Sequence, residues 1–578
     1  MSATPEPPVP DAPAVLASLA AAYWDAYLEA HPVFATAVGH AGHDDRLADP
    51  TPAGSAATLA VLDAIGRRVG ALDAATLPPA DRITLSALHE SIAADRAELE
   101  TGLLDWNVDP LDGVPTLFLQ VPSFQRLATT EDGARMVARW RAMAIYTDRH
   151  LATLRSSLAG GRVACRAPMN RVVAILEGLL QSPVESWPLL EPLAGLERLD
   201  GWTTSERERF AADLRGAVDD EIRPAFTRLH DGLVADLLPG ARPPERPGMC
   251  HVPDGLAAYR RLIHVHTSLD VDAETLHRIG LEEITRIDAE LADLAGRTIG
   301  ARSLGDALAG LRGDPALHFI SRDEVFDTAA TSLARAAEAI PDWFGRLPQA
   351  PCEVVRMGAH EEEHTTIAYY RQPAPDGSRP GQYYINTSHP ETRPRYEAEA
   401  LAYHEAVPGH HLQIAIGQEL PGLPEFRRHL GPTAFFEGWG LYTERLADEM
   451  GLYSGDLDRI GVLSYDAWRA SRLVVDTGMH ALGWSREQAI RFMLDHTALA
   501  PNNIANEVDR YIAIPGQALA YKAGQLEILR LRAGARERLG GAFDIRDFHD
   551  TVLGNGAIAL PTLRTVVEAW MAGASTPA

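Results

Sequence analysis

The feature that most constrains this chain is a helical hydrophobic period that recurs along almost its whole length. Apolar residues return at i, i+3, i+4 and i+7 in stretches rich in Ala, Leu, Arg and Glu, which places them on one face of an α-helix. The clearest runs are 130–160, 205–237, 272–297, 323–341 and 458–482. The pattern predicts a mainly α-helical protein. Its first helix is expected to start at Asp11, with Pro13 in the first turn.

Residues 350–390 interrupt the helical period. They contain alternating and β-branched runs (CEVVRM, TTIAYYRQ and GQYYINT), which turn residues such as Pro375-Asp376-Gly377 separate. These runs predict a small β-sheet within the helical body.

The chain shows no Ser/Gly linker after a Pro-rich start, so one large domain is expected. Residues 1–12 are predicted to form a flexible tail and residues 13–573 a single two-lobed domain. Within it we expect a helical lobe over 13–349, the sheet over 350–390, and helices that carry metal ligands over 391–573.

Charge and cysteine content exclude several classes of function. The chain has 53 Lys and Arg against 79 Asp and Glu, a net charge of −26, so neither nucleic acid nor an anionic membrane surface is an expected partner. Only three cysteines occur, without a CxxC pair, so a bound metal must use His and carboxylate ligands. The start of the chain lacks a basic segment followed by a long apolar one, which predicts a cytoplasmic protein.

A literal H-E-x-x-H motif occurs at His360-Glu361-Glu362-Glu363-His364. This spacing binds zinc when both histidines lie on one face of an anchored helix. Here the motif follows Met357-Gly358 and lies between two strand-like runs, so we interpret it as a solvated turn.

A second group of histidines is better placed, in the segment His404-Glu405-Ala406-Val407-Pro408-Gly409-His410-His411. Pro408 lacks the N–H that would bond the carbonyl of His404, so the helix must bend there. On a straight helix His410 lies about 120° around and about 9 Å along from His404, whereas His411 regains the right face at about 10.5 Å. Because the bend changes both distances, this geometry leaves His410 and His411 open as the second ligand.

A third ligand is expected from the apolar stretch Phe435 to Glu444. Glu437 is a carboxylate in an aromatic environment, where burial without a cation would cost several kcal/mol. Glu444, seven residues later, lies on the same helical face and is a candidate hydrogen-bond acceptor for a ligand imidazole. A salt bridge of Glu444 with Arg445 is the alternative.

Further candidates could donate a hydrogen bond to a developing oxyanion. Tyr511 and Tyr521 flank a Pro-Gly-Gln segment, and His480 shares a helical stripe with Arg472 and Asp476, which could orient it. Arg472 suits a substrate carboxylate because its guanidinium binds in a bidentate manner. Core tyrosines and an Arg472–Asp476 ion pair are the alternatives.

At these residues the chain resembles a bacterial family known only as domain of unknown function number 885. Its members carry H-E-A-x-P-G-H-H-L-Q followed by F-x-E-G-W, and the similarity extends over nearly the whole chain, including Pro380 to Thr387, Arg472 to His480 and Pro515 to Lys522. That family is in turn similar to helical zinc peptidases such as thimet oligopeptidase, Taq carboxypeptidase and angiotensin-converting enzyme. The resemblance implies a two-lobed helical body around a deep cleft.

The zinc peptidases read H-E-x-G-H-x-L, so the resemblance favours His410 over His411, although this chain has two extra residues between Glu405 and His410. It also implies that the strand Gln382–Thr387, with Tyr384 and Asn386, is an edge to which an extended substrate peptide adds.

We therefore expect a zinc-dependent metallopeptidase that hydrolyses short peptides. Zn²⁺ would be held by His404, His410 and Glu437, and Glu405 would be the general base. Two alternatives stay open: a metal-dependent hydrolase of a small non-peptide amide metabolite, and a non-catalytic helical scaffold that binds a partner. The sequence does not determine the oligomeric state.

Overall fold

The protein is mainly helical in a computed structural model that describes residues 11–358, 362, 367–374, 377 and 379–574. The helices before the sheet are α1 (Ala12–Ala30), α2 (Pro32–Ala37), α3 (Pro52–Val69), α4 (Pro79–Thr101), α5 (Thr116–Gln120), α6 (Thr130–Ala159), α7 (Arg166–Gln181), α8 (Thr204–Gly216), α9 (Arg223–Gly232), α10 (Gly255–Thr267), α11 (Ala273–Thr298), α12 (Leu304–Gly313) and α13 (Arg322–Ala339). Those after it are α15 (Ala398–Glu405), α16 (His410–Glu419), α17 (Glu425–His429), α18 (Thr433–Glu449), α19 (Asp456–His480), α20 (Arg486–His496), α21 (Pro501–Ala513), α22 (Leu519–Leu539), α23 (Ile545–Leu553) and α24 (Leu560–Ala574).

These bounds confirm the predicted helical fold class. The periodic runs correspond to α6, α11, α13 and α19, and to the helical stretch from α8 to residue 237, while α1 starts directly after Asp11. Polar caps define several of the starts. The side chain of Thr129 accepts a hydrogen bond from the N–H of Asp132 at the start of α6, and Asp272 does the same for Thr275 at the start of α11.

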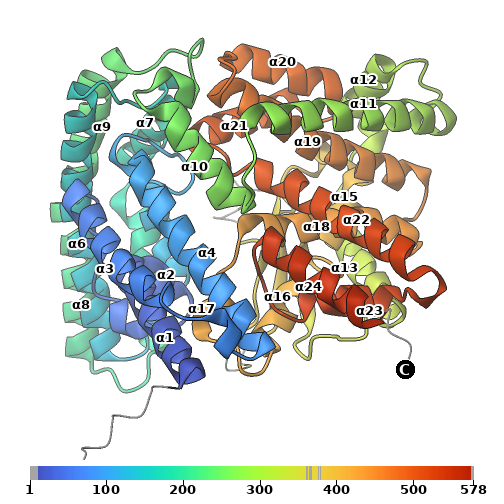
Figure 1. Ribbon diagram of the computed structural model, residues 1–578. Helices are drawn as coiled ribbons and strands as arrows, with labels where there is room; N and C mark the ends of the chain where they lie inside the picture. The colour runs from blue at the N-terminus through green and yellow to red at the C-terminus, as the bar shows by residue number, and fades with distance from the viewer. Residues whose placement is uncertain (1–10, 359–361, 363–366, 375–376, 378, 575–578) are drawn as a thin grey trace, which may run out of the picture.

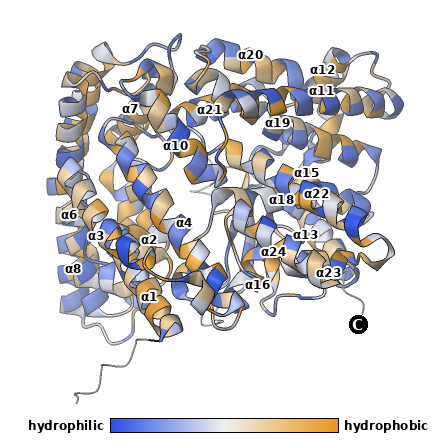
Figure 2. Ribbon diagram, in the orientation of Figure 1, coloured by the Kyte–Doolittle hydropathy of each residue, from blue (hydrophilic) through white to orange (hydrophobic). Residues whose placement is uncertain are grey.

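The helices gather into two groups (Figure 1). Helices α1 to α9 lie on one side, and most of α11 to α24 lie on the other, with α10 between them. Hydrophilic and hydrophobic residues alternate along most helices in Figure 2, as expected for helices that bury one face. Helices α11 and α13 pack against α19 and α15, so they join the part of the chain that carries the candidate metal ligands. A deep cleft between two lobes stays a prediction.

The predicted small sheet is present, with strands β1 (Cys352–Arg356), β2 (Ala368–Arg371) and β3 (Gly381–Ile385). Their order is β1-β3-β2, with β3 parallel to β1 and antiparallel to β2. The central position of β3 corrects one prediction. Since β3 has a hydrogen-bonded strand on both sides, it cannot be the edge to which a substrate peptide adds.

Two glycines bring α18 close to α22. A Cβ atom on Gly438 would lie 2.4 Å from the Cα of Gly524, so the two backbones touch where these residues meet. Helix α18 also packs against α15. These contacts fix the position of Glu437, the neighbour of Gly438, relative to α15.

None of the helices in the described ranges is both long enough and apolar enough to cross a membrane.

Candidate metal centre

A break in the helix lies between α15 and α16, as Pro408 predicted. Helix α15 ends at Glu405, and α16 begins at His410. Gly409 is required in the break, because a Cβ atom there would lie 1.9 Å from the carbonyl oxygen of His404. The indole Nε1–H of Trp439 on α18 donates to the Pro408 carbonyl at 3.0 Å. Helix α18 thus holds the break in place.

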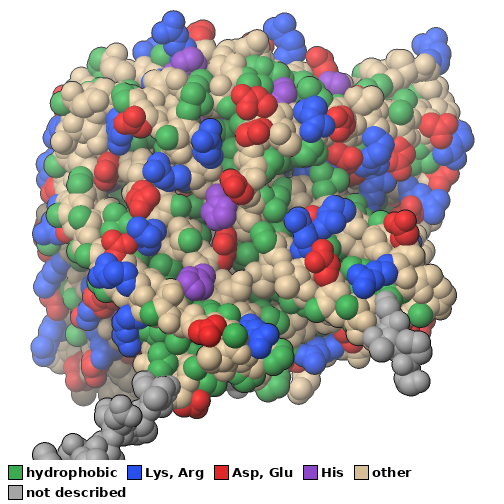
Figure 3. Space-filling model, viewed as in Figure 1, with side chains coloured by type: hydrophobic (Ala, Val, Ile, Leu, Met, Phe, Trp, Pro, Cys, Tyr) green, Lys and Arg blue, Asp and Glu red, His purple; other side chains and the backbone are tan. Residues whose placement is uncertain are grey.

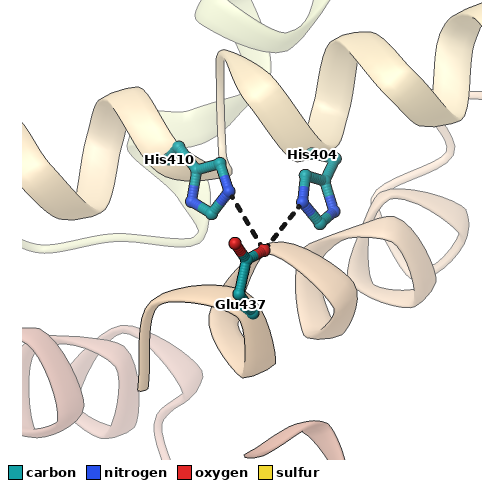
Figure 4. Close-up of side chains that lie close together, drawn as sticks. All are labelled: His404, His410 and Glu437. Atoms are coloured by element: carbon teal, nitrogen blue, oxygen red, sulfur yellow. Dashed lines mark ion pairs between the residues drawn. The ribbon is translucent and has the colours of Figure 1, made fainter. Parts of the chain in front are cut away.

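The break brings His404 and His410 together over Glu437 (Figure 4). The Nε2 atoms of His404 and His410 each lie 3.5 Å from the same carboxylate oxygen of Glu437. One ligand atom from each residue lies within 4.8 Å of those of the other two, and the imidazole centroids are 4.7 Å apart. The three residues predicted as metal ligands are therefore neighbours in space.

Glycine 440 makes room for the His404 ring. It lies one helical turn after Glu437, and a Cβ atom there would lie 2.7 Å from Cε1 of His404. The ring is only 3% exposed, so it has no space to move away. The G-W-G sequence after Glu437 thus serves two contacts, since its first glycine packs on α22 and its second on His404.

Glu444 orients His404. Nδ1 of His404 lies 2.8 Å from Oε1 of Glu444, which turns Nε2 of the same ring toward Glu437. Glu444 is fully buried, and a guanidinium nitrogen of Arg469 lies 3.7 Å away. The alternative partner Arg445 instead pairs with Glu290 and Asp466. The geometry is that of a carboxylate that fixes a metal-binding imidazole.

The electrostatics of the group favour a cation. Burial alone would lower the pKa of His404, but hydrogen bonds to Glu437 and Glu444 raise it to about 9. Burial would raise the pKa of Glu437, yet its hydrogen bonds to the two imidazoles hold it well below the usual range. Two carboxylates thus stabilise positive charge at the point where the three side chains meet.

His411 is engaged elsewhere. Its Nδ1 is 3.0 Å from the hydroxyl of Tyr370 on β2, and its Nε2 is 3.0 Å from the carbonyl of Ala350. Burial lowers its pKa to about 4. Both ring nitrogens therefore bind the sheet side of the break, and His410 is the histidine that meets His404.

Glu405 and Tyr383 lie together beside the break. Glu405 is half-buried at the end of α15, and Tyr383 is fully buried in the same hydrophobic cluster as Ala402 and Ala406 of that helix. Burial and the nearby charge of Glu405 raise the pKa of the Tyr383 hydroxyl well above its usual range. Within the described residues this hydroxyl has no hydrogen-bond partner.

The sequence predicts a substrate contact for Tyr384 and none for its neighbour Tyr383. Tyr384 faces the other way, where its ring stacks on Tyr369 and its hydroxyl donates to Gln382. The two-residue alternation of the strand could have predicted that Tyr383 is the buried tyrosine, because Gly381, Tyr383 and Ile385 share the buried face. Asn386, the other predicted substrate contact, is buried, and its side chain donates to the Glu362 carbonyl and accepts from Ser388.

His480 does not have the surroundings that were predicted. Its Nδ1 accepts from the N–H of Met249, and its Nε2–H donates to the carbonyl of Tyr511. Burial lowers its pKa to about 3, so the ring is neutral and both nitrogens are used. Asp476 does not orient it, because that carboxylate accepts from Tyr259 and from the backbone of Gly516.

Arg472 and Tyr511 form a buried group with Glu507. Arg472 donates to the Tyr511 hydroxyl at 2.8 Å and to Glu507 at 2.9 Å, and Tyr511 donates to Glu507 at 2.7 Å. The predicted alternative, an Arg472–Asp476 pair, is not formed. Tyr521 is half-buried, with its ring 4.2 Å from the Arg472 guanidinium.

The H-E-x-x-H segment lies outside the described residues except for Glu362. That side chain is buried and accepts from Arg322 at 2.5 Å and Thr387 at 3.1 Å. At this position the predicted solvated turn is wrong, because an ion pair compensates the burial of the carboxylate.

These features define a mainly helical protein with a His, His, Glu group that a metal ion would fit. Residues 32–567 match the family described as "Bacterial protein of unknown function (DUF885)". The chain belongs to this family.

Two solved structures share the fold. A "putative lipoprotein" from Colwellia psychrerythraea is 26% identical with a TM-score of 0.91, and the match covers 98% of this chain and 100% of that one. A "putative lipoprotein of unknown function" from Shewanella oneidensis is 18% identical with a TM-score of 0.74, covering 96% of this chain and 99% of that one. No curated protein matches the chain.

Proposed function

We propose that this protein is a zinc-dependent hydrolase that cleaves amide bonds of short peptides. The observation that carries the proposal is the meeting of His404, His410 and Glu437, with Glu444 behind His404. Two histidines and one glutamate are a ligand set of catalytic zinc sites, which keep a fourth position open for water or substrate.

The geometry of the three side chains supports a metal of this size. Tetrahedral ligands at about 2.0 to 2.1 Å from a zinc ion lie about 3.4 Å from one another. The two distances between imidazole nitrogen and carboxylate oxygen are 3.5 Å. Glu444 fits as well, since a ligand imidazole normally donates its other N–H to a carboxylate or carbonyl.

Glu405 is the general base of the proposed reaction. When bound, zinc supplies Lewis acidity that polarises an amide carbonyl and acidifies a water molecule. Glu405 follows His404 directly and is half-buried. In the proposed reaction its carboxylate accepts a proton from the attacking water and delivers it to the leaving amine. Tyr521 is the remaining candidate among the predicted hydrogen-bond donors to the oxyanion.

The proposal of a peptide substrate is based on the resemblance to helical zinc peptidases. The proposal that an amide bond is cleaved is based on the proposed metal centre. On the face shown in Figure 3 acidic and basic side chains alternate without a continuous basic stripe, which supports a small substrate over nucleic acid.

The cytoplasm is the proposed location. Cell fractionation tests it, with membrane association as the contrary outcome.

Metal content and turnover in matched variants test the proposal. Purified wild type is expected to carry one zinc per chain and to hydrolyse members of a dipeptide and tripeptide library. Glu405→Gln is expected to retain the metal and to lose at least about 10²-fold in turnover, because general base catalysis contributes about 10² to 10⁴-fold. Arg491→Gln, an exposed change at a residue whose side chain is 71% accessible, is the control.

Three outcomes would contradict it. Unchanged turnover in Glu405→Gln overturns the role of this residue. Hydrolysis of non-peptide amides without peptide cleavage replaces the substrate class. Absence of stoichiometric metal in protein purified without chelator favours a non-catalytic scaffold.

A further inference from the structure

A cavity of about 200 Å³ lies beside α16, on the helical face that carries His410. Gln413, Ile414 and Gly417 line it, and they follow His410 by three, four and seven residues, which places all four on one face. Phe436, the neighbour of Glu437, lines another side. The cavity therefore adjoins the helices that supply two of the three candidate metal ligands.

The lining of this cavity is basic in a chain that is strongly acidic overall. Arg427, Arg428 and His429 of α17 contribute to it, and no Asp or Glu does so among the described residues. The net charge of the chain is −26, so a carboxylate-free basic lining is a local exception that favours an anion.

Arg427 is a buried charge without a counter-ion. Its side chain is 4% exposed and donates to the hydroxyl of Thr84 at 2.8 Å and to the carbonyl of Asn555. Its Nε has no hydrogen-bond partner in the described part of the chain, and no described carboxylate acts on the pKa of Arg427. Burial lowers its pKa to about 10. By contrast Arg532, equally buried, is paired with Glu449 at 2.6 Å.

The neighbouring groups do not neutralise Arg427. Glu425 lies 3.8 Å from the guanidinium of Arg428 and 3.5 Å from the imidazole of His429, so its charge serves those two residues. Arg428 also donates to the carbonyls of Leu423 and Leu420. Arg427 also lines a second cavity of about 20 Å³, whose one carboxylate, Glu90, is 3.3 Å from an imidazole nitrogen of His264. A buried guanidinium without a carboxylate partner is a place where an incoming carboxylate would gain a charge-assisted interaction.

We infer that this cavity binds the C-terminal carboxylate of a short peptide, with Arg427 as its counter-ion. The inference rests on the proposed function and adds the polarity of the substrate. Gln413 and Gly417 lie about 4.5 and about 10.5 Å beyond His410 along the helix axis, at 1.5 Å per residue. An extended peptide advances about 3.3 Å per residue, so the carboxylate lies one to three residues beyond the cleaved bond. The enzyme then removes short pieces from the carboxyl end.

Ligand binding to the metal-free protein tests the cavity separately from catalysis. The probes are N-acetyl-leucine, which carries the carboxylate, and N-acetyl-leucinamide, which does not, each titrated into the protein by calorimetry. The wild type is expected to bind the acid at least about tenfold more tightly than the amide, because a hydrogen bond to a charged group is worth roughly that factor. Arg427→Gln is expected to abolish the difference, and Arg427→Lys to restore part of it.

A second variant leaves Arg427 intact. Gly417→Leu fills the cavity from α16, where a Cβ atom has only ordinary contact, 4.0 Å to Gly556, so the variant is expected to fold. It is expected to weaken binding of the acid at least about tenfold, while the exposed control Arg491→Gln binds like the wild type.

The following outcomes overturn the inference. Equal binding of acid and amide, or unchanged binding in both Arg427→Gln and Gly417→Leu, removes the site. Equal competition by inorganic phosphate at the same concentration means an adventitious ion only. If these binding results hold but no peptide is cleaved by the metal-loaded protein, the proposed function fails while the carboxylate site stands.

Discussion

Replacing Gly440 by alanine tests how the proposed metal centre is built. The added Cβ would lie 2.7 Å from Cε1 and 2.9 Å from Nε2 of His404, whereas ordinary contacts begin at 3.4 Å. The ring must therefore shift by about 0.7 Å, the difference between 3.4 and 2.7 Å. A metal site tolerates deviations of about 0.2 Å in its ligand distances. We expect zinc affinity to fall at least about tenfold, a loss in the range seen when a ligand is no longer held in place.

Stability is expected to change much less than metal affinity. Overpacking costs about 1 to 3 kcal/mol, and replacing glycine by alanine inside a helix recovers about 1 kcal/mol. The net free energy of unfolding of Gly440→Ala should thus fall by about 0 to 2 kcal/mol.

Zinc affinity is measured by competition with a fluorescent chelator, and stability by urea unfolding of the metal-free protein. Gly534→Ala is the matched control, because Gly534 lies exposed inside α22 with nothing within 4 Å of an added Cβ. It should gain up to about 1 kcal/mol of stability and bind zinc like the wild type. Wild-type zinc affinity in Gly440→Ala would refute the reasoning.

Three further predictions follow from the contacts. Glu444→Gln should lower zinc affinity about 10 to 100-fold, because the amide keeps the shape but not the charge that holds His404; an unchanged dissociation constant in the chelator assay contradicts this. His410→Ala should abolish stoichiometric zinc while His411→Ala retains it, since His411 binds the sheet; equal losses by elemental analysis contradict the assignment. Burial would raise the pKa of Glu507, but Arg510 and Arg472 lower it to about 2. The ion pairs of Glu507 with these two arginines therefore stabilise the fold above pH 4.5, and up to about 3 kcal/mol of this stability is lost as the pH falls to about 2. Urea unfolding between pH 5 and 2 should show a shallower pH dependence of stability in Glu507→Gln than in the wild type.

Local sequence rules predicted the helices and the break at the centre. The 3.6-residue period, polar caps and helix-forming composition act within a few neighbouring residues, so they can be read from the chain. The same holds for Pro408, because a missing N–H ends an α-helix wherever it occurs. Helix α15 ends at Glu405, three residues before Pro408, because the backbone of Ala406 already departs from helical dihedral angles.

Strand order and side-chain partners depended on packing. The runs in 350–390 predicted strands, but β3 became the central strand because both β1 and β2 pair with it, which no single run reveals. For the same reason Asp476 accepts a hydrogen bond from Tyr259 and does not bind His480. Packing likewise decides that the charge of Glu405 acts on the hydroxyl of Tyr383. These choices depend on contacts between segments that are distant in sequence.

The candidate metal centre also depends in part on local sequence and in part on packing. The chain alone determined which residue types were available and that a bend lies between two of them. It did not determine whether His410 or His411 turns toward His404, or that Glu437 reaches both. Those outcomes follow from the close approach of α18 to α22 and α15 at glycine contacts, and from the sheet atoms that occupy His411. Ligand distances are set by the packing of whole helices, a property that belongs to the folded body and not to any stretch of it.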